Sequence, residues 1–356
     1  MESLGNFPDP FIAEISGQPA ALRRAAEAVR EQAAILGEVA GSAADRTVVF
    51  TGMGSSYHAC YPAVTQLARD GIAAVMVDSA ELLHFRAGML GARTELVAVS
   101  QSGESAEVVR VVEDVRRQAE PPRVIAVTNG VANTLRGLAD LALDTRAGAE
   151  TGPSTMTFAA SLVAVGALGR SLGGHGVDAT VHALGDQAEA AAAAVERLLQ
   201  DEGLADRIVD RVAPRGTVVI LGRGPARAAA EMGALTVKEA VGMPIESLQT
   251  AQFRHGPLEL AGPDLAALII ATEPETRSLD LSLADELLAM GASVLTVTTE
   301  AGGPDGAMNV AIGAVESTVA PAASILPAQL LAWRLSILRG REPGAYHHAS
   351  KVTTRE

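Results

Sequence analysis

Residues 95–105 read ELVAVSQSGES, an apolar run that leads directly into a hydroxyl-rich turn. A strand without polar alternation is typical of a parallel sheet that helices cover on both faces. After the turn, the sequence through Gln118 has the spacing of a helix. This strand–turn–helix order predicts an α/β domain, and the same order recurs along the chain.

Further strands and helices are expected on both sides of this segment. The expected strands are residues 47–50, 74–77, 123–127 and 141–144 in the first half, and 216–221, 265–271 and 293–298 in the second. The expected helices include residues 19–41, 79–86, 279–290 and 320–339. Strands alternating with helices favour a parallel sheet in each half of the chain.

Two glycine turns, Gly52-Met53-Gly54 and Gly222-Arg223-Gly224, each follow an apolar strand and precede a helix. Their repetition predicts a duplicated α/β domain. The expected division is an N-terminal helical segment (1–45), a first domain (46–172), a linker helix (173–212), a second domain (213–340) and a C-terminal tail (341–356).

The composition excludes several classes of function. The formal net charge of −14 argues against a nucleic-acid partner, because a phosphate polymer requires a broad basic surface. The single cysteine, Cys60, excludes an internal disulfide framework and a cysteine-based metal site. No apolar stretch reaches the roughly 18–20 residues of a membrane span, and Met1–Pro10 lacks the features of a signal peptide. We expect a cytoplasmic protein with no membrane contact and no metal.

Three hydroxyl-rich segments follow expected strands: Gly54–Ser56, Ser100–Ser105 and Glu150–Thr155. Ligands of open parallel sheets bind beyond the carboxyl ends of the strands. Hydroxyls and free backbone N–H groups at a helix start can hold a monophosphate without a lysine. The alternative is helix capping, since serine and threonine are favoured N-cap residues. The recurrence of three such segments favours phosphate binding.

The glycine turns also suggest a dinucleotide site. Both lack the third glycine of that fingerprint, with Tyr57 and Arg227 at its position, although Asp78 could act as the ribose-binding acid. A nicotinamide oxidoreductase is therefore a minor alternative, and no cofactor is expected.

Glu239 and His255 are candidates for proton transfer in the second half. Glu239 lies on the helix after the second glycine turn, and His255 follows in Arg254-His-Gly-Pro257. A carboxylate and a histidine commonly move protons at carbon. Taken singly, a glutamate such as Glu239 is more often a solvated helix residue, and a histidine such as His255 is more often a turn residue.

Four motifs together resemble the sugar-isomerase (SIS) domain family, in particular the isomerase half of glucosamine-6-phosphate synthase and its stand-alone deaminase and deglycase relatives. Ser100–Ser105 is similar to the S-Q-S-G-E-[ST] signature of SIS domains. Val237–Glu239 followed by Arg254–Leu258 resembles the second-domain motif of the synthase. Ile15–Pro19 and Ala349–Thr353 resemble its beginning and its lysine-bearing tail. The resemblance implies two tandem SIS domains, each a flavodoxin-like three-layer sandwich.

The resemblance also implies roles for individual residues. Glu239 would move the proton between C1 and C2, His255 would assist ring opening, and Lys351 would lie over the site on a closing tail. The family implies a homodimer with shared active sites, in which His255 reaches the neighbouring subunit's site. The residues expected to bind the sugar phosphate are Ser55, Ser56, Ser100, Gln101, Ser102, Ser105 and Ser154.

The chain departs from the synthase in three respects, and the two lost lysines among them suggest changed chemistry or a changed substrate. Thr236 and Met156 stand where the synthase has lysines, and we expect no glutaminase domain. The leading hypothesis is an isomerase or deaminase of an amino-sugar phosphate, of the glucosamine-6-phosphate/fructose-6-phosphate type. The alternatives are a fructosamine-6-phosphate deglycase and a non-catalytic sugar-phosphate sensor, although no basic helix-turn-helix accompanies the domains.

Overall fold

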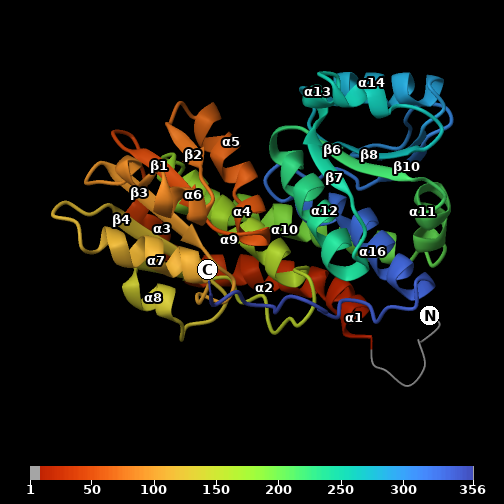
Figure 1. The fold of residues 1–356 in the computed structure, drawn as a ribbon. Helices are drawn as coiled ribbons and strands as arrows, with labels where there is room; N and C mark the ends of the chain where they lie inside the picture. The colour runs from red at the N-terminus through yellow and green to blue at the C-terminus, as the bar shows by residue number, and fades with distance from the viewer. Residues whose placement is uncertain (1–8, 356) are drawn as a thin grey trace. The chain divides into compact units, whose positions relative to one another are not determined.

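The chain forms two compact units, each built around one five-stranded parallel sheet (Figure 1). The structure, a computed structural model, describes residues 9–355. Most of Met1–Pro10, the segment that we expect not to be a signal peptide, lies outside the described residues. The β1–β5 unit comprises Ala20–Ala149, Met156–Glu189 and the chain from His348 onward. The β6–β10 unit comprises the chain up to Pro19, Glu150–Thr155 and Ala190–His347.

The sheet of the β1–β5 unit has the strand order β2-β1-β3-β4-β5, with every pair parallel. Its strands are β1 (Thr47–Thr51), β2 (Ala74–Met76), β3 (Thr94–Val99), β4 (Arg123–Thr128) and β5 (Leu141–Asp144). Its helices are α3 (Ala33–Val39), α4 (Ser55–His58), α5 (Tyr61–Arg69), α6 (Ser79–His84), η1 (Ala87–Met89), α7 (Ala106–Val115), α8 (Thr134–Leu138) and α9 (Met156–Leu172). Two more helices, α2 (Gln18–Glu31) and α10 (Val177–Leu199), contribute residues to both units.

Helices cover both faces of this sheet, which explains why all six residues of β3 are buried. Helices α6, α7 and α8 pack on one face, where Val108, Val111, Val112 and Val115 of α7 form a buried stripe at helical spacing. Helices α3, α5 and α9 pack together on the other face. The sequence pattern therefore predicted this three-layer arrangement correctly.

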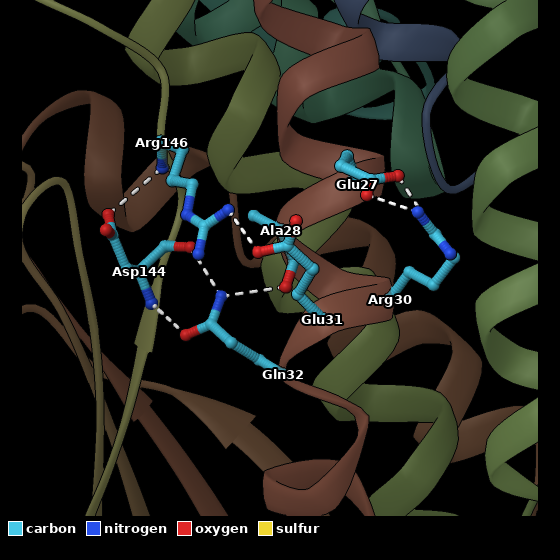
Figure 2. A network of polar contacts seen from close by, with 7 residues as sticks. All are labelled: Glu27, Ala28, Arg30, Glu31, Gln32, Asp144 and Arg146. Atoms are coloured by element: carbon cyan, nitrogen blue, oxygen red, sulfur yellow. Dashed lines mark hydrogen bonds and ion pairs between the residues drawn. The ribbon is translucent and has the colours of Figure 1, made fainter.

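The exposed edge of β5 is covered by a side chain from the end of α2 (Figure 2). The Gln32 amide donates to the Asp144 carbonyl and accepts from the Asp144 N–H, both at 2.9 Å, as a neighbouring strand would. The same amide donates to the Ala28 carbonyl at 2.9 Å, and Arg146 forms a 2.6 Å ion pair with Glu31. These contacts satisfy edge groups that could otherwise pair with another chain.

The β6–β10 unit repeats the same topology, with strand order β7-β6-β8-β9-β10 and parallel pairing throughout. Its strands are β6 (Thr217–Gly222), β7 (Glu246–Gln249), β8 (Leu265–Ala271), β9 (Ser293–Thr298) and β10 (Met308–Ala311). Its helices are α1 (Pro10–Ser16), α11 (Leu204–Val212), η2 (Gly224–Ala226), α12 (Arg227–Val241), α13 (Thr250–Phe253), η3 (Pro257–Leu260), α14 (Arg277–Ala289), α15 (Ala320–Ser324) and α16 (Leu326–Leu338).

Helices α13 and α14 cover one face of this second sheet, and α11, α12 and α16 cover the other (Figure 1). Phe253 of α13 and Leu283 and Leu287 of α14 are fully buried against β6 and β8. The predicted duplicated α/β fold is confirmed, because in both sheets the third strand lies beside the first and the order of the strands reverses there, while all strands stay parallel.

Several elements differ from the sequence expectation. Strands β8 and β9 have the expected bounds, but the expected helix 19–41 is interrupted at Gln32 and the expected helix 320–339 at Ile325. The sequence did not reveal β7 and β10, which are edge strands of four residues. Edge strands bury less surface, so their apolar pattern is weaker. No helix within residues 9–355 has the length and apolarity that crossing a membrane requires.

Candidate functional site

Three serine hydroxyls lie on the turn between β3 and α7, which we call the serine loop (residues 100–105). The Oγ atoms of Ser100 and Ser105 lie 3.1 Å apart, although five residues separate them. The Gly103 N–H donates to Ser100 Oγ and the Glu104 N–H donates to Ser102 Oγ, each at 3.1 Å. The loop therefore folds back on itself and gathers its hydroxyls ahead of the start of α7.

Contacts with the neighbouring turn after β4 hold the serine loop in this shape. Gly103 has φ +68°, and a Cβ there would lie 2.2 Å from Asn133 Oδ1, so only glycine fits. The Glu104 carboxylate accepts hydrogen bonds from Thr134 N–H and Oγ1, both at 2.8 Å. The carboxylate of Glu104, the one acidic residue of the loop, is therefore hydrogen-bonded to Thr134. The three serines lie in the same short turn.

Ser55 and Ser56 lie at the start of α4, directly after β1. Strands β1 and β3 are neighbours, and their carboxyl ends meet where the strand order reverses, as expected for a ligand site. A Cβ on Gly52 would lie 2.9 Å from the Val99 carbonyl oxygen. Gly52, the first glycine of this turn, therefore allows the two strand ends to pack closely. Ser56 is buried and Ser55 is half-buried.

The C-terminal tail reaches the start of α7. The Ala106 N–H, the first amide of the helix after the N-cap Ser105, donates to the Thr353 carbonyl at 3.1 Å. Ser105 makes no side-chain cap bond, so its hydroxyl stays with Ser100. The structure thus places the segment that carries Lys351 beside the serine loop within one unit.

Glu239, His255 and Ser154 belong to the β6–β10 unit. Half-buried Glu239 lies in the last turn of α12, which ends at Gly242 with a left-handed φ of +64°. Exposed His255 lies on the turn after α13, where its backbone N–H donates to the Gln252 carbonyl at 2.9 Å. These three roles remain predictions.

The threonine that replaces a family lysine has a local explanation. Thr236 is fully buried, and its hydroxyl donates to the Met232 carbonyl one turn earlier at 2.9 Å. A buried hydroxyl is neutral and is satisfied by its own helix. A lysine at this place would bring a charge that the buried position leaves unsolvated.

Two carboxylates that the sequence did not single out shape the segment around Ser154. Glu14 of α1 accepts from Thr151 N–H at 2.5 Å, Thr151 Oγ1 at 2.8 Å and Gly152 N–H at 3.1 Å. Glu150 Oε1 accepts from Thr155 N–H and Oγ1 at 2.8 and 2.9 Å. The only sequence signal for Glu14 was its position directly before the Ile15–Pro19 motif.

That motif is explained by packing in the β6–β10 unit. The Gln18 and Gln329 side-chain amides are buried and bond each other reciprocally at 2.9 and 3.1 Å. Such a pair satisfies both amides in the apolar interior. Gln18 therefore joins the start of α2 to α16, and we assign the motif a structural role.

The turn after β8 corresponds to the serine loop but carries carboxylates. Glu273 is buried and accepts from Ser317 Oγ at 2.7 Å. Asp280 of α14 is buried 3.0 Å from the Arg223 guanidinium. Burial raises the pKa of Asp280, although Arg223 opposes the shift. Within residues 9–355, no three His, Cys, Asp or Glu side chains are grouped as metal ligands.

Comparisons with known proteins agree with this architecture. The SIS domain family model matches residues 43–170 and 212–339. The chain is 31% identical over 369 residues to the isomerizing glutamine–fructose-6-phosphate aminotransferase of Pyrobaculum aerophilum, and 31% identical over 372 residues to that of Aeropyrum pernix. These alignments cover 100% and 99% of this chain but only 59% and 58% of the relatives.

Solved structures show the same fold. The C-terminal domain of glucosamine-fructose-6-phosphate aminotransferase from Francisella tularensis has a TM-score of 0.84 at 22% identity, covering 96% of this chain and 99% of that one. A glucosamine-6-phosphate deaminase from Thermotoga maritima has a TM-score of 0.74 at 20% identity, covering 96% and 99%. The resemblance inferred from the motifs is thereby confirmed.

Proposed function

Because the chain belongs to the SIS domain family, we propose that it is a sugar-phosphate aldose–ketose isomerase or deaminase. Its substrate is an amino-sugar phosphate of the glucosamine-6-phosphate/fructose-6-phosphate type. The observation that carries the proposal is the serine loop, whose hydroxyls gather at the start of α7 where the lysine-bearing tail also arrives.

The serine loop binds the phosphate of the substrate. A helix start provides backbone N–H groups and a partial positive charge, and serine hydroxyls add further donors. Glu104, the acidic residue of the loop, is engaged with Thr134. The residues assigned to the sugar phosphate are Ser55, Ser56, Ser100, Gln101, Ser102, Ser105 and Ser154.

Glu239 performs the proton transfer between C1 and C2 of the open-chain sugar. Its carboxylate takes the proton from one carbon and returns it to the other, so that aldose and ketose interconvert without net loss of a proton. His255 assists ring opening, and its exposed position suits an approach to the neighbouring subunit's substrate. Lys351 engages the ketose carbonyl.

The enzyme acts in the cytoplasm as a homodimer with shared active sites. It requires no metal and no organic cofactor for this reaction, because proton transfer and imine chemistry need only side chains. For a deaminase, the amino group leaves as ammonia after the imine is hydrolysed.

The test measures ammonia release from glucosamine 6-phosphate and a panel of fructosamine 6-phosphates, with Glu239→Gln as the matched variant. We expect release from one substrate and a loss of at least about 100-fold in Glu239→Gln, because general acid–base catalysis contributes 10²–10⁴-fold. Full turnover by the Glu239→Gln protein would eliminate the proton-transfer role.

Other outcomes identify the alternatives. Release from fructosamine 6-phosphates alone would establish a deglycase. If no ammonia appears, a ketose–aldose interconversion assay separates an isomerase from a sensor that binds sugar phosphate without turnover. Reduction of NAD or NADP with substrate would point instead to an oxidoreductase.

A further inference from the structure

A cavity of about 620 Å³ lies at the amino ends of β1, β2 and β3, within the β1–β5 unit. Its walls come from the segments before β1, β2 and β4 and from the turn between η1 and β3. The serine loop follows the carboxyl end of β3, so the two places lie at opposite edges of one parallel sheet. The volume is within the range of small-molecule pockets, and none of the residues assigned to the sugar phosphate lines it.

The turn between η1 and β3 is held in shape by the chain's own hydrogen bonds. Buried Thr94 donates from Oγ1 to the Met89 carbonyl at 3.0 Å and accepts from the Gly91 N–H at 3.3 Å. Gly88 and Gly91 line the cavity, and a Cβ on either would meet no atom within 4 Å. The two glycines therefore border open space on a wall that is already ordered.

Arg46 and Arg93 supply two positive charges to the lining of the cavity. Arg46 Nη1 donates to the Ala92 carbonyl at 3.2 Å, and its Nε lies 3.5 Å from Oε1 of fully buried Glu95. Glu95 also accepts from Arg123 Nε, at the shorter distance of 2.8 Å. A guanidinium group has five N–H donors, so these contacts fix the position of Arg46 and leave donors for a ligand.

Three exposed side chains of both charges line the same cavity without pairing. Within residues 9–355, the side chains of Arg93, Asp45 and Glu120 form no hydrogen bond and no ion pair. A ligand with only a negative charge would be repelled by the two carboxylates, and one with only a positive charge would be repelled by the arginines. A small molecule that carries both charges is therefore complementary to this lining.

We propose that this cavity is a second small-molecule site, which binds a zwitterion with one anionic group and one ammonium group. Arg46 and Arg93 bind the anionic group, because guanidinium groups suit the geometry of carboxylates and phosphates. Asp45 and Glu120 accept hydrogen bonds from the ammonium group. Amino-sugar phosphates and α-amino acids share this chemistry. The inference goes beyond the proposed reaction, since neither the serine loop nor Glu239 takes part in it.

Isothermal titration calorimetry tests the site with glucosamine 6-phosphate. The protein is the whole chain with Ser102→Glu and Glu239→Gln, because a carboxylate in the serine loop repels phosphate there and the second change removes turnover. We expect binding, and an affinity at least about 10-fold lower when Arg93→Gln is added, since hydrogen bonds to a charged group are lost. Arg117→Gln, an exposed arginine of the same unit outside the cavity, should leave the affinity unchanged.

A second variant fills the cavity. Gly91→Phe keeps the backbone N–H that bonds to Thr94, and its side chain starts in open space. We expect it to abolish binding of glucosamine 6-phosphate at an unchanged melting temperature. Gly137→Phe on α8, where an added Cβ also meets nothing within 4 Å, is the matched control and should keep the binding. Binding that survives both Gly91→Phe and Arg93→Gln would place the ligand elsewhere and overturn the proposal.

Two further probes in the same titration identify the ligand. Fructose 6-phosphate lacks the amino group and should bind at least about 10-fold more weakly than glucosamine 6-phosphate; equal affinity would overturn the zwitterion assignment. Tighter binding of L-glutamine would assign the site to an amino acid, and tighter binding of glucosamine 6-phosphate to an amino-sugar phosphate. If neither compound binds, the proposal fails. Ammonia release is measured on the unchanged protein, so the proposed function stands or fails independently.

Discussion

The turn after β3 and the turn after β8 occupy the same place in two sheets of identical strand order, yet they carry opposite chemistry. The first contains serines and ends in α7, whose buried residues include Val108, Val111, Val112 and Val115. The second contains buried Glu273 and ends in α14, whose buried stripe includes Asp280, Leu283 and Leu287 at the same spacing. A valine position of one repeat thus corresponds to an aspartate of the other.

The carboxylates make the second turn unsuitable for a phosphate. Two unit charges about 4 Å apart interact by about 4 kcal/mol at an effective dielectric constant near 20. Two arginines near this turn are already paired, Arg223 with Asp280 at 3.0 Å and Arg277, the first residue of α14, with Glu300 at 2.9 Å. Both sheets have a point where the strand order reverses, and under the proposed function only the one beside the serine loop binds the phosphate.

The largest expected effect comes from giving the serine loop a carboxylate. Ser102→Glu should weaken binding of fructose 6-phosphate by about 1,000-fold, because about 4 kcal/mol of repulsion is close to three factors of ten. Isothermal titration calorimetry measures this effect. The matched control is Glu275→Ser on the second turn, which should change binding less than about twofold. Equal losses in both variants would show that the two turns do not differ as described.

An intermediate effect is expected from two of the glycines with positive φ, one on each turn. Gly103→Ala should destabilise the protein by about 3 kcal/mol, since a left-handed alanine costs 1–2 kcal/mol and overpacking adds 1–3 kcal/mol. Gly224→Ala should cost only about 1 kcal/mol, because its φ is +56° but the nearest atom to an added Cβ is 4.0 Å away. Urea unfolding compares the two. A larger loss in Gly224→Ala would contradict the packing argument for Gly103.

The smallest expected effect is the formation of one covalent adduct between a sugar phosphate and a lysine. Each unit contains one lysine, so the position of the adduct shows which unit binds the carbonyl group. The chain has two lysines, Lys351 in the β1–β5 unit and Lys238 in the β6–β10 unit. If Lys351 forms an imine with a ketose carbonyl, releasing water, borohydride reduces that imine to a stable amine. Peptide mass spectrometry should find one reduced sugar-phosphate adduct on Lys351 and none on Lys238. A Lys238 adduct alone would reassign the carbonyl-binding lysine.

Most of the fold was predictable from the sequence, but the edge strands of the second sheet were not. Central strand β8 is continuously apolar, and β9 combines apolar residues with Ser and Thr that are all buried, so the bounds of both followed from composition. The edge strands β7 and β10 have half-exposed polar residues, and their pairing depends on neighbours that only the folded chain supplies. The break at Gln32 was also hidden, because its amide bonds to Asp144, 112 residues away.

The candidate site was predictable in its residue types more than in its geometry. The sequence pointed to the serine loop and to Glu239, but it gave no reason to select Asn133, and its only signal for Glu14 was the position before the Ile15–Pro19 motif. Asn133 fills the space that makes Gly103 obligatory, and Glu14 orders Thr151 across 137 residues of sequence. Such roles arise from contacts between distant segments, which residue type and spacing do not encode.

By itself, the sequence determined the α/β class, the duplication and the hydroxyl-rich loop, because apolar strand runs and turn residues act locally along the chain. The tertiary structure decided that Ser100 and Ser105 meet and that the second turn is filled by buried carboxylates. It also decided that the Glu14 carboxylate accepts hydrogen bonds from the Thr151 and Gly152 N–H groups. Burial and electrostatics depend on which segments pack together, so these properties become defined only once the chain has folded.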